Sequence, residues 1–119
     1  MATALKRKLS GSTDGKGIKV VATATAGTAI HTAVAGTTAG TFDEIWLFAY
    51  NSSADPVTLT IEFGDATAPD HNIVLTLASK SGLQLIVPGL ILQNGATVKA
   101  FASSANVITI SGFVNSITD

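Results

Sequence analysis

The side chains that could bind a metal ion or transfer a proton are few, and their spacing suits neither task. The chain has two histidines, His31 and His71, and neither lies in a spacing such as HExxH that brings two imidazoles to one zinc ion. Asp65 and Asp70 flank a loop with His71, and Asp55 begins another loop, but the carboxylate pattern of an EF-hand is missing. We therefore expect no metal site and no cofactor.

Nucleophilic catalysis and glycoside hydrolysis also lack their sequence signatures. No serine lies in a GxSxG turn, and the glycines form neither GxGxxG nor a phosphate-binding loop. Asp43 and Glu44 are adjacent, so on a β-strand their carboxylates would point to opposite faces and could not act together across one cleft. We expect a protein that is not an enzyme.

Aromatic side chains are concentrated in the segment FDEIWLFAYNSS. On a strand, Trp46, Phe48 and Tyr50 would share one face. The other face would carry Ile45, Leu47 and Ala49. Such an aromatic row forms either a buried surface or a platform on which sugars stack. We expect an oligomer interface made by these rings with Phe101 and Phe113, and a sugar platform is the alternative.

The segments that would position these rings have the pattern of β-strands. PVTLTIEFGD alternates between apolar and polar residues, which predicts an antiparallel strand with one face in water. Two further segments, HNIVLTLAS and GLQLIVPG, have the same character. The residues predicted to face inward are Val57, Leu59, Ile61 and Phe63 in the first and Ile73, Leu75 and Leu77 in the second, and Leu83, Leu85 and Val87 are predicted to share one side of the third.

Turn signals divide the rest of the chain into further short strands. The Ala/Thr/Gly-rich segment predicts strands near residues 18–26 and 28–35. Asn94-Gly95 supplies the positive φ angles of a type I′ turn, which predicts a hairpin. The strand at 106–115 is apolar on both faces, like that at 42–50. About eight short strands without a helical period predict an all-β fold, an antiparallel two-sheet sandwich.

Charge is scarce and unevenly distributed. Charged residues make up 13% of the chain, whereas a typical soluble domain has about 25%, so we expect partners to cover part of the surface. The first nineteen residues carry a net charge of +4 and the remainder −5. We therefore divide the chain into a basic N-terminal arm, residues 1–17, and a β-sandwich domain, residues 18–119. The arm is either a disordered tail or a segment that docks on an acidic neighbour through Lys6, Arg7 and Lys8.

Several classes of partner and location are disfavoured. Interleaved aromatics and a basic stripe, the signature of nucleic-acid binding, do not follow the arm. The apolar stretch GLQLIVPGLILQNG is broken by Pro88 and Gly89 and is shorter than the ~20 residues of a membrane span. No secretion signal is evident, and the absence of cysteine fits synthesis in a reducing cytoplasm.

The C-terminal half, GLQLIVPGLILQNGATVKAFASSANVITISGFVNSI, resembles the closing strands of small structural proteins of tailed-bacteriophage virions. The matching features are an apolar strand ending at Val87-Pro88, a turn at Asn94-Gly95, an Ala-rich strand over 98–102 and a Gly-aromatic-Val ending at 112–114. The segment FDEIWLFAYNSSADPVTLTIEFG also suits that group, so the resemblance spans roughly residues 42–117.

This resemblance implies a jelly-roll-like sandwich with an extended N-terminal arm, serving as a capsid decoration (cement) protein. Such a protein would be found in the virion after synthesis in the host cytoplasm. It would form a homo-oligomer, commonly a homotrimer, and bind the major capsid protein or other virion proteins. A head–tail connector or tail protein has the same features and stays an alternative. A carbohydrate-binding β-sandwich is the alternative from another class.

Overall fold

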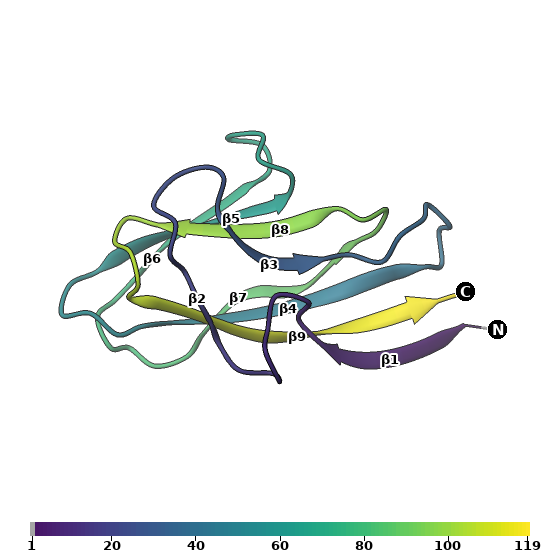
Figure 1. Ribbon diagram of the computed structural model, residues 1–119, viewed down its shortest axis with the longest axis horizontal. Helices are drawn as coiled ribbons and strands as arrows, with labels where there is room; N and C mark the ends of the chain where they lie inside the picture. The colour runs from purple at the N-terminus through teal and green to yellow at the C-terminus, as the bar shows by residue number, and fades with distance from the viewer. Residues whose placement is uncertain (1) are drawn as a thin grey trace.

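Nine β-strands and no helix make up the computed structural model, which describes residues 2–119 (Figure 1). In chain order the strands are β1 (Thr3–Lys8), β2 (Ile18–Lys19), β3 (Thr28–Thr32), β4 (Phe42–Asn51), β5 (Val57–Gly64), β6 (Asn72–Leu77), β7 (Gln84–Leu92), β8 (Thr97–Ala102) and β9 (Ile108–Thr118). The first sheet has the order β1-β9-β4-β7, with β2 also paired to β9, and the second sheet has the order β3-β8-β5-β6. All pairings are antiparallel, so the predicted all-β, two-sheet sandwich is confirmed.

The connectivity of the strands is that of a jelly roll. The chain forms one long antiparallel ribbon, in which β2 pairs with β9, β3 with β8, β4 with β7 and β5 with β6. Rolling this ribbon brings β4 beside β9 and β5 beside β8, which completes the two sheets. Figure 1 shows the two sheets stacked one above the other.

The core lies between the sheets and follows the two-residue alternation of the strands. On β4, Ile45, Leu47 and Ala49 are fully buried, as the sequence predicts. They pack in one cluster with inward residues of β5, β8 and β9. These partners are Val57, Leu59, Ile61, Val98, Ala100, Ala102, Ile108, Ile110 and Val114. Because side chains of a strand alternate between its faces, the same register turns the intervening residues of β4 outward.

The segment expected as a basic N-terminal arm pairs in part with the sandwich. β1 runs antiparallel to β9 from Thr3 opposite Thr118 to Lys8 opposite Phe113. Leu9 follows and is 1% exposed in the core, and the chain then crosses β3, where the Gly11 N–H donates to the Ile30 carbonyl at 2.9 Å. The basic residues obscured this strand in the sequence. Their backbone groups find partners on β9 while their charges stay in water.

The Ala/Thr/Gly-rich segment forms less strand than predicted, because β2 and β3 end well short of the expected ranges. The residues between them pack on the outer side of the second sheet, where Thr25 Oγ1 and Gly27 N donate to the carboxylate of Glu62 at 2.8 and 2.7 Å. Glu62 is 1% exposed, although its face of β5 was predicted to be wet. The close approach of this segment to the sheet requires a glycine at position 27, because a Cβ there would lie 2.6 Å from the Ala100 carbonyl oxygen.

The Asn94-Gly95 turn has the predicted conformation but not the predicted pairing. Both residues have positive φ, 61° and 68°, and the Ala96 N–H donates to the Gln93 carbonyl at 3.2 Å. However, β7 pairs with β4 in the first sheet while β8 lies in the second, so the predicted hairpin is wrong. The Asn-Gly motif sets the conformation of the turn but does not determine which strand β7 pairs with. β7 pairs with β4, which has ten residues, whereas β8 has six.

Two irregularities in β7 also change which of its side chains share a face. Val87 is fully buried, but Leu83 and Leu85 are 59% and 50% exposed, because the register with β4 shifts between Val87 and Leu85. A second shift follows Pro88, at Gly89, whose φ is +80°. An extra residue in one strand of a pair reverses the alternation beyond it. The prediction that all three residues share one face is therefore wrong.

The burial of Leu9 gives a test of whether the N-terminal segment is part of the fold. We expect Leu9→Ala to lower the free energy of unfolding by about 2–5 kcal/mol, as is usual for a fully buried leucine. Leu5→Ala is the matched control, since Leu5 is 49% exposed, and it should cost less than about 1 kcal/mol. Urea denaturation followed by far-UV circular dichroism measures both. Equal effects would contradict the structure.

Candidate functional site

The outer side of the first sheet carries a row of aromatic side chains, which we call the aromatic face: Trp46, Phe48 and Tyr50 of β4 and Phe113 of β9. All four are half-buried. They point away from the core because they alternate with its fully buried residues. Trp46 lies opposite Phe113 in the register of β4 and β9. The four rings therefore form one continuous surface, as predicted for three of them from their spacing.

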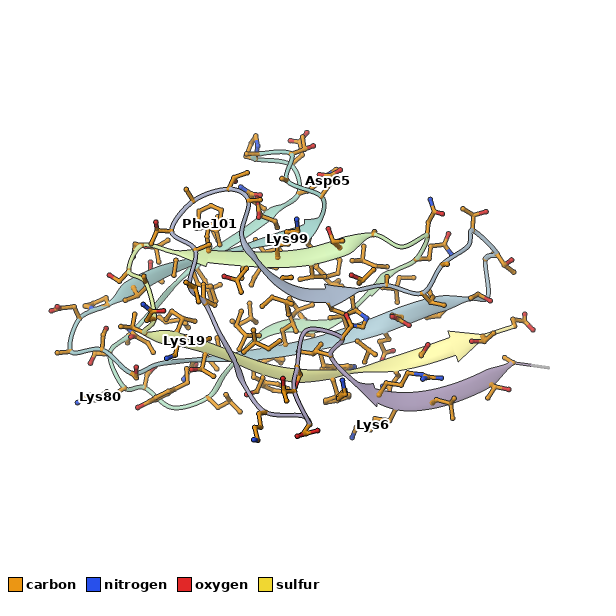
Figure 2. The ribbon with its side chains drawn as sticks, viewed as in Figure 1. Lys6, Lys19, Asp65, Lys80, Lys99 and Phe101 are labelled. Carbon is orange, nitrogen blue, oxygen red and sulfur yellow. The ribbon has the colours of Figure 1, made fainter. Side chains whose placement is uncertain are left out.

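Two rings and one ammonium group lie in contact on this face. The ring centroids of Trp46 and Phe113 are 6.1 Å apart with an interplanar angle of 13°. Lys6 Nζ of β1 lies 4.3 Å from the centroid of Phe113, which is a cation–π distance. Figure 2 shows Lys6 extending from β1 away from the second sheet. The N-terminal segment thus covers one end of the aromatic face and leaves the rest to solvent.

Glu44 fixes the indole of Trp46 in place. Trp46 Nε1 donates to Glu44 Oε1 at 2.7 Å, and Asn115 Nδ2 donates to the same oxygen at 2.9 Å. These hydrogen bonds, that of Trp46 first, hold the pKa of Glu44 below its ordinary value of 4.5. Gly89 provides the space for the indole, because a Cβ there would lie 2.9 Å from Trp46 Cζ2. The most prominent ring of the face is therefore held rigidly.

The surface next to these rings is apolar and nearly uncharged. On the β7 side, Leu85 lies opposite Phe48 and Ile91 opposite Glu44, and these two side chains are 50% and 55% exposed. A cavity of about 440 Å³ near Phe42 is also lined by Ile91 and Leu92. Glu44 supplies the one carboxylate that β4, β7 and β9 direct outward. Contiguous exposed apolar surface of this kind is typical of an interaction site.

The other predicted interface residue, Phe101, lies elsewhere. It is on β8 opposite Thr60 of β5, in the second sheet, and Figure 2 shows it on the far side of the sandwich from Lys6. Phe101 therefore cannot join the same contact surface as the aromatic face. Its position one residue from Ala100 and Ala102, both buried, accounts for its outward direction.

The basic residues of β1 divide between its two sides. Lys6 lies over Phe113, as described, and Lys8 Nζ donates to the Ser12 carbonyl at 3.1 Å. Arg7 points to the other side and lines a second cavity of about 440 Å³. All three residues are exposed. The predicted docking residues are thus close in space but do not form one patch on one face.

Sequence reasoning missed a buried histidine–aspartate pair near the end of the sandwich that holds both termini. His31 Nε2 lies 2.7 Å from Asp43 Oδ2, and the Ser10 N–H donates to His31 Nδ1 at 3.0 Å. Since Nδ1 accepts, Nε2 carries the ring proton and donates to Asp43. Both nitrogens are hydrogen-bonded, so the ring ties together the segments that contain Ser10, His31 and Asp43. A separation of twelve residues gives no local signal for this pair.

A second histidine–aspartate pair lies in the loop between β5 and β6. His71 Nδ1 contacts Asp65 Oδ1, and this hydrogen bond lowers the pKa of Asp65 to about 2 and raises that of His71. Within residues 2–119, no cluster of three or more His, Cys, Asp or Glu side chains is arranged to hold a metal ion. The same residues include no helix that is long and apolar enough to cross a membrane.

Comparison with known proteins adds no relative to this description. No protein-family model, no curated protein and no solved structure matches the chain. The candidate site therefore depends on its own geometry: a rigid, half-exposed aromatic surface with little charge and a basic strand at its margin.

The hydrogen bond between Glu44 and Trp46 predicts a pH-dependent change in tryptophan fluorescence, which reports on Trp46 alone because the chain has one tryptophan. A carboxylate whose pKa is lowered in the folded state stabilises the fold at pH values above its ordinary pKa of 4.5. That stabilisation is lost as the pH falls through the lowered pKa. We expect an emission change with a midpoint below 4.5. Glu44→Gln should abolish it. A midpoint at or above 4.5, or an unchanged titration in the variant, would show that the contact is absent.

Proposed function

We propose that this protein is a non-enzymatic structural component of a bacteriophage virion, a decoration (cement) protein that stabilises the capsid shell as a homo-oligomer. The observation that carries the proposal is the aromatic face. Trp46, Phe48 and Tyr50 lie on a central strand whose other side is already buried in the core, and their own chain covers them only in part. A second copy of the protein, packed on this side, removes the remaining apolar surface from water.

The energetics favour assembly that is assisted by a lattice. Burying roughly 400 Å² of apolar surface contributes about 10 kcal/mol at 25 cal/mol per Å². Association costs about 4–15 kcal/mol in lost translational and rotational freedom. The two terms are similar in size, so a single interface of this area is marginal in dilute solution. Subunits that also bind a shell gain a high local concentration, and this makes the same interface effective.

A closed homotrimer requires heterologous contacts, in which two different patches of each subunit meet. The chain offers two apolar patches that adjoin: the aromatic face and the exposed aliphatic residues on the outer side of β7, Leu85 and Ile91. In the proposed assembly, Lys6, Arg7 and Lys8 bind acidic groups of the major capsid protein. Salt weakens that electrostatic contribution and leaves the apolar interface largely intact. A head–tail connector or tail protein would use the same surfaces.

A carbohydrate-binding module is the second candidate, and the rigid indole of Trp46 favours it. Sugar rings stack on exposed aromatic side chains, and carboxylates and amides such as those of Glu44 and Asn115 bind hydroxyl groups. Jelly rolls occur among both capsid and lectin domains, so the fold is compatible with either function. Glu44 and Asn115 already bond to each other and Glu44 to Trp46, which leaves fewer groups for a sugar and ranks this candidate second.

Charge placed on the aromatic face should abolish self-association. We expect the unaltered chain to sediment as a trimer at high concentration and Phe48→Glu as a monomer, because an unpaired carboxylate would have to be desolvated in the interface. The matched control is Phe101→Glu, on the outer side of the second sheet, which should still form trimers. Sedimentation velocity measures all three. A chain that is monomeric at every concentration, or a Phe48→Glu variant that assembles normally, would refute the proposal.

A glycan array decides between the two candidates. A structural protein should show no saturable binding to any sugar. Saturable binding that is lost in Trp46→Ala, with the far-UV circular dichroism spectrum unchanged, would establish the carbohydrate-binding function in place of the structural one.

A further inference from the structure

We propose that β1 is a docking strand for an extended acidic polypeptide, which adds to its free edge and extends the first sheet by one strand. Figure 1 shows β1, in purple, at the rim of the sheet beyond β9. This inference rests on the proposed docking of Lys6, Arg7 and Lys8 on an acidic partner, and its site is separate from the aromatic face, which Lys6 touches only at Phe113. Either surface can therefore be tested, and can fail, without the other.

The backbone of β1 is open on one side. All six residues pair with β9, and no second strand pairs with β1 within the described chain. Apart from this ladder, no backbone hydrogen bond of Thr3–Lys8 occurs within residues 2–119. An edge strand presents alternate N–H and C=O groups away from its neighbour, and these groups can pair with an added strand.

The other three sheet edges differ from β1. The edge of β3 is covered, because the Thr32 N–H donates to Ser10 Oγ at 2.7 Å and Gly11 N–H to the Ile30 carbonyl at 2.9 Å. The edge strand β7 is interrupted by two register shifts and contains Pro88, which has no N–H to donate. The remaining edge, β6, has no charged residue that would select an occupant.

The charge of β1 selects the chemistry of its partner. Lys6, Arg7 and Lys8 are consecutive and exposed, and no carboxylate within residues 2–119 forms a salt bridge with any of them. Two copies of β1 placed edge to edge would bring these like charges together, which disfavours self-pairing. A strand that carries carboxylates on both of its sides is complementary, because Lys6 and Lys8 point to one side of the sheet and Arg7 to the other.

The inner side of β1 has room for the side chains of an added strand. Arg7 lies at a cavity of about 440 Å³ whose lining also includes Ser116 and Asp43, and the neighbouring Leu5 is 49% exposed. The expected partner therefore alternates acidic residues on the outer side with acidic and apolar residues on the inner side.

A dye-labelled hexapeptide, acetyl-Glu-Asp-Glu-Val-Glu-Thr-amide, is the probe, and fluorescence anisotropy with the full chain at low salt is the measurement. We expect saturable binding that weakens at least tenfold in Arg7→Glu and severalfold in Arg7→Gln. The matched control is Lys80→Glu, an exposed lysine that Figure 2 shows at the left end of the molecule, away from Lys6, and it should bind as the unaltered chain does. Circular dichroism verifies that each variant is folded.

Two N-methylated peptides separate strand addition from simple charge attraction. One is methylated on the first, third and fifth amides and the other on the second, fourth and sixth, so each keeps the charge but loses one set of donors. We expect one of the two to lose binding, since only one set faces β1. Equal binding by both methylated peptides, no binding by the parent peptide, or equal weakening by Arg7→Glu and Lys80→Glu would each overturn the proposal.

Discussion

The fold depends on β4, which lies between β9 and β7 and has apolar side chains on both faces. Its inner face, with Ile45, Leu47 and Ala49 fully buried, packs in one core with inward residues of β5, β8 and β9. Its outer face cannot be buried in the same way, because a two-layer sandwich has no third layer. The chain reduces this exposure locally through Lys6 over Phe113 and Glu44 beside Trp46, and the rest of the surface is what the proposed partner copy would cover.

Much of this fold could be predicted from the sequence, because the alternation of apolar residues and the turn motifs that determine it are local. The two-residue alternation identified the inward faces of β4 and β5, and the Asn94-Gly95 dipeptide identified its turn conformation. The pairing of strands was less accessible, since each pair of the rolled ribbon except β5 with β6 joins segments distant in the chain. That is why a correct turn was assigned to an incorrect hairpin, and why Phe101 was grouped with rings on the other sheet.

The features that sequence reasoning missed are those in which tertiary contacts override local character. β1 is rich in charge and has little strand propensity, yet β9 supplies its hydrogen bonds. Glu62 looked solvated but is enclosed by Thr25 and Gly27 from a distant loop. The pair of His31 and Asp43 joins β3 of the second sheet to β4 of the first. None of these contacts leaves a periodic signal in the chain.

The most direct measurement of whether a partner copy covers the aromatic face is acrylamide quenching of the single tryptophan across a range of protein concentrations. Trp46 is half-buried in one chain and becomes shielded when a second copy packs on it. The quenching constant should therefore fall severalfold as the protein is concentrated, in step with the increase in mass seen by light scattering. A quenching constant that stays unchanged while the mass increases would show that assembly uses another surface. A mass that does not increase would show that the protein does not self-associate through this face.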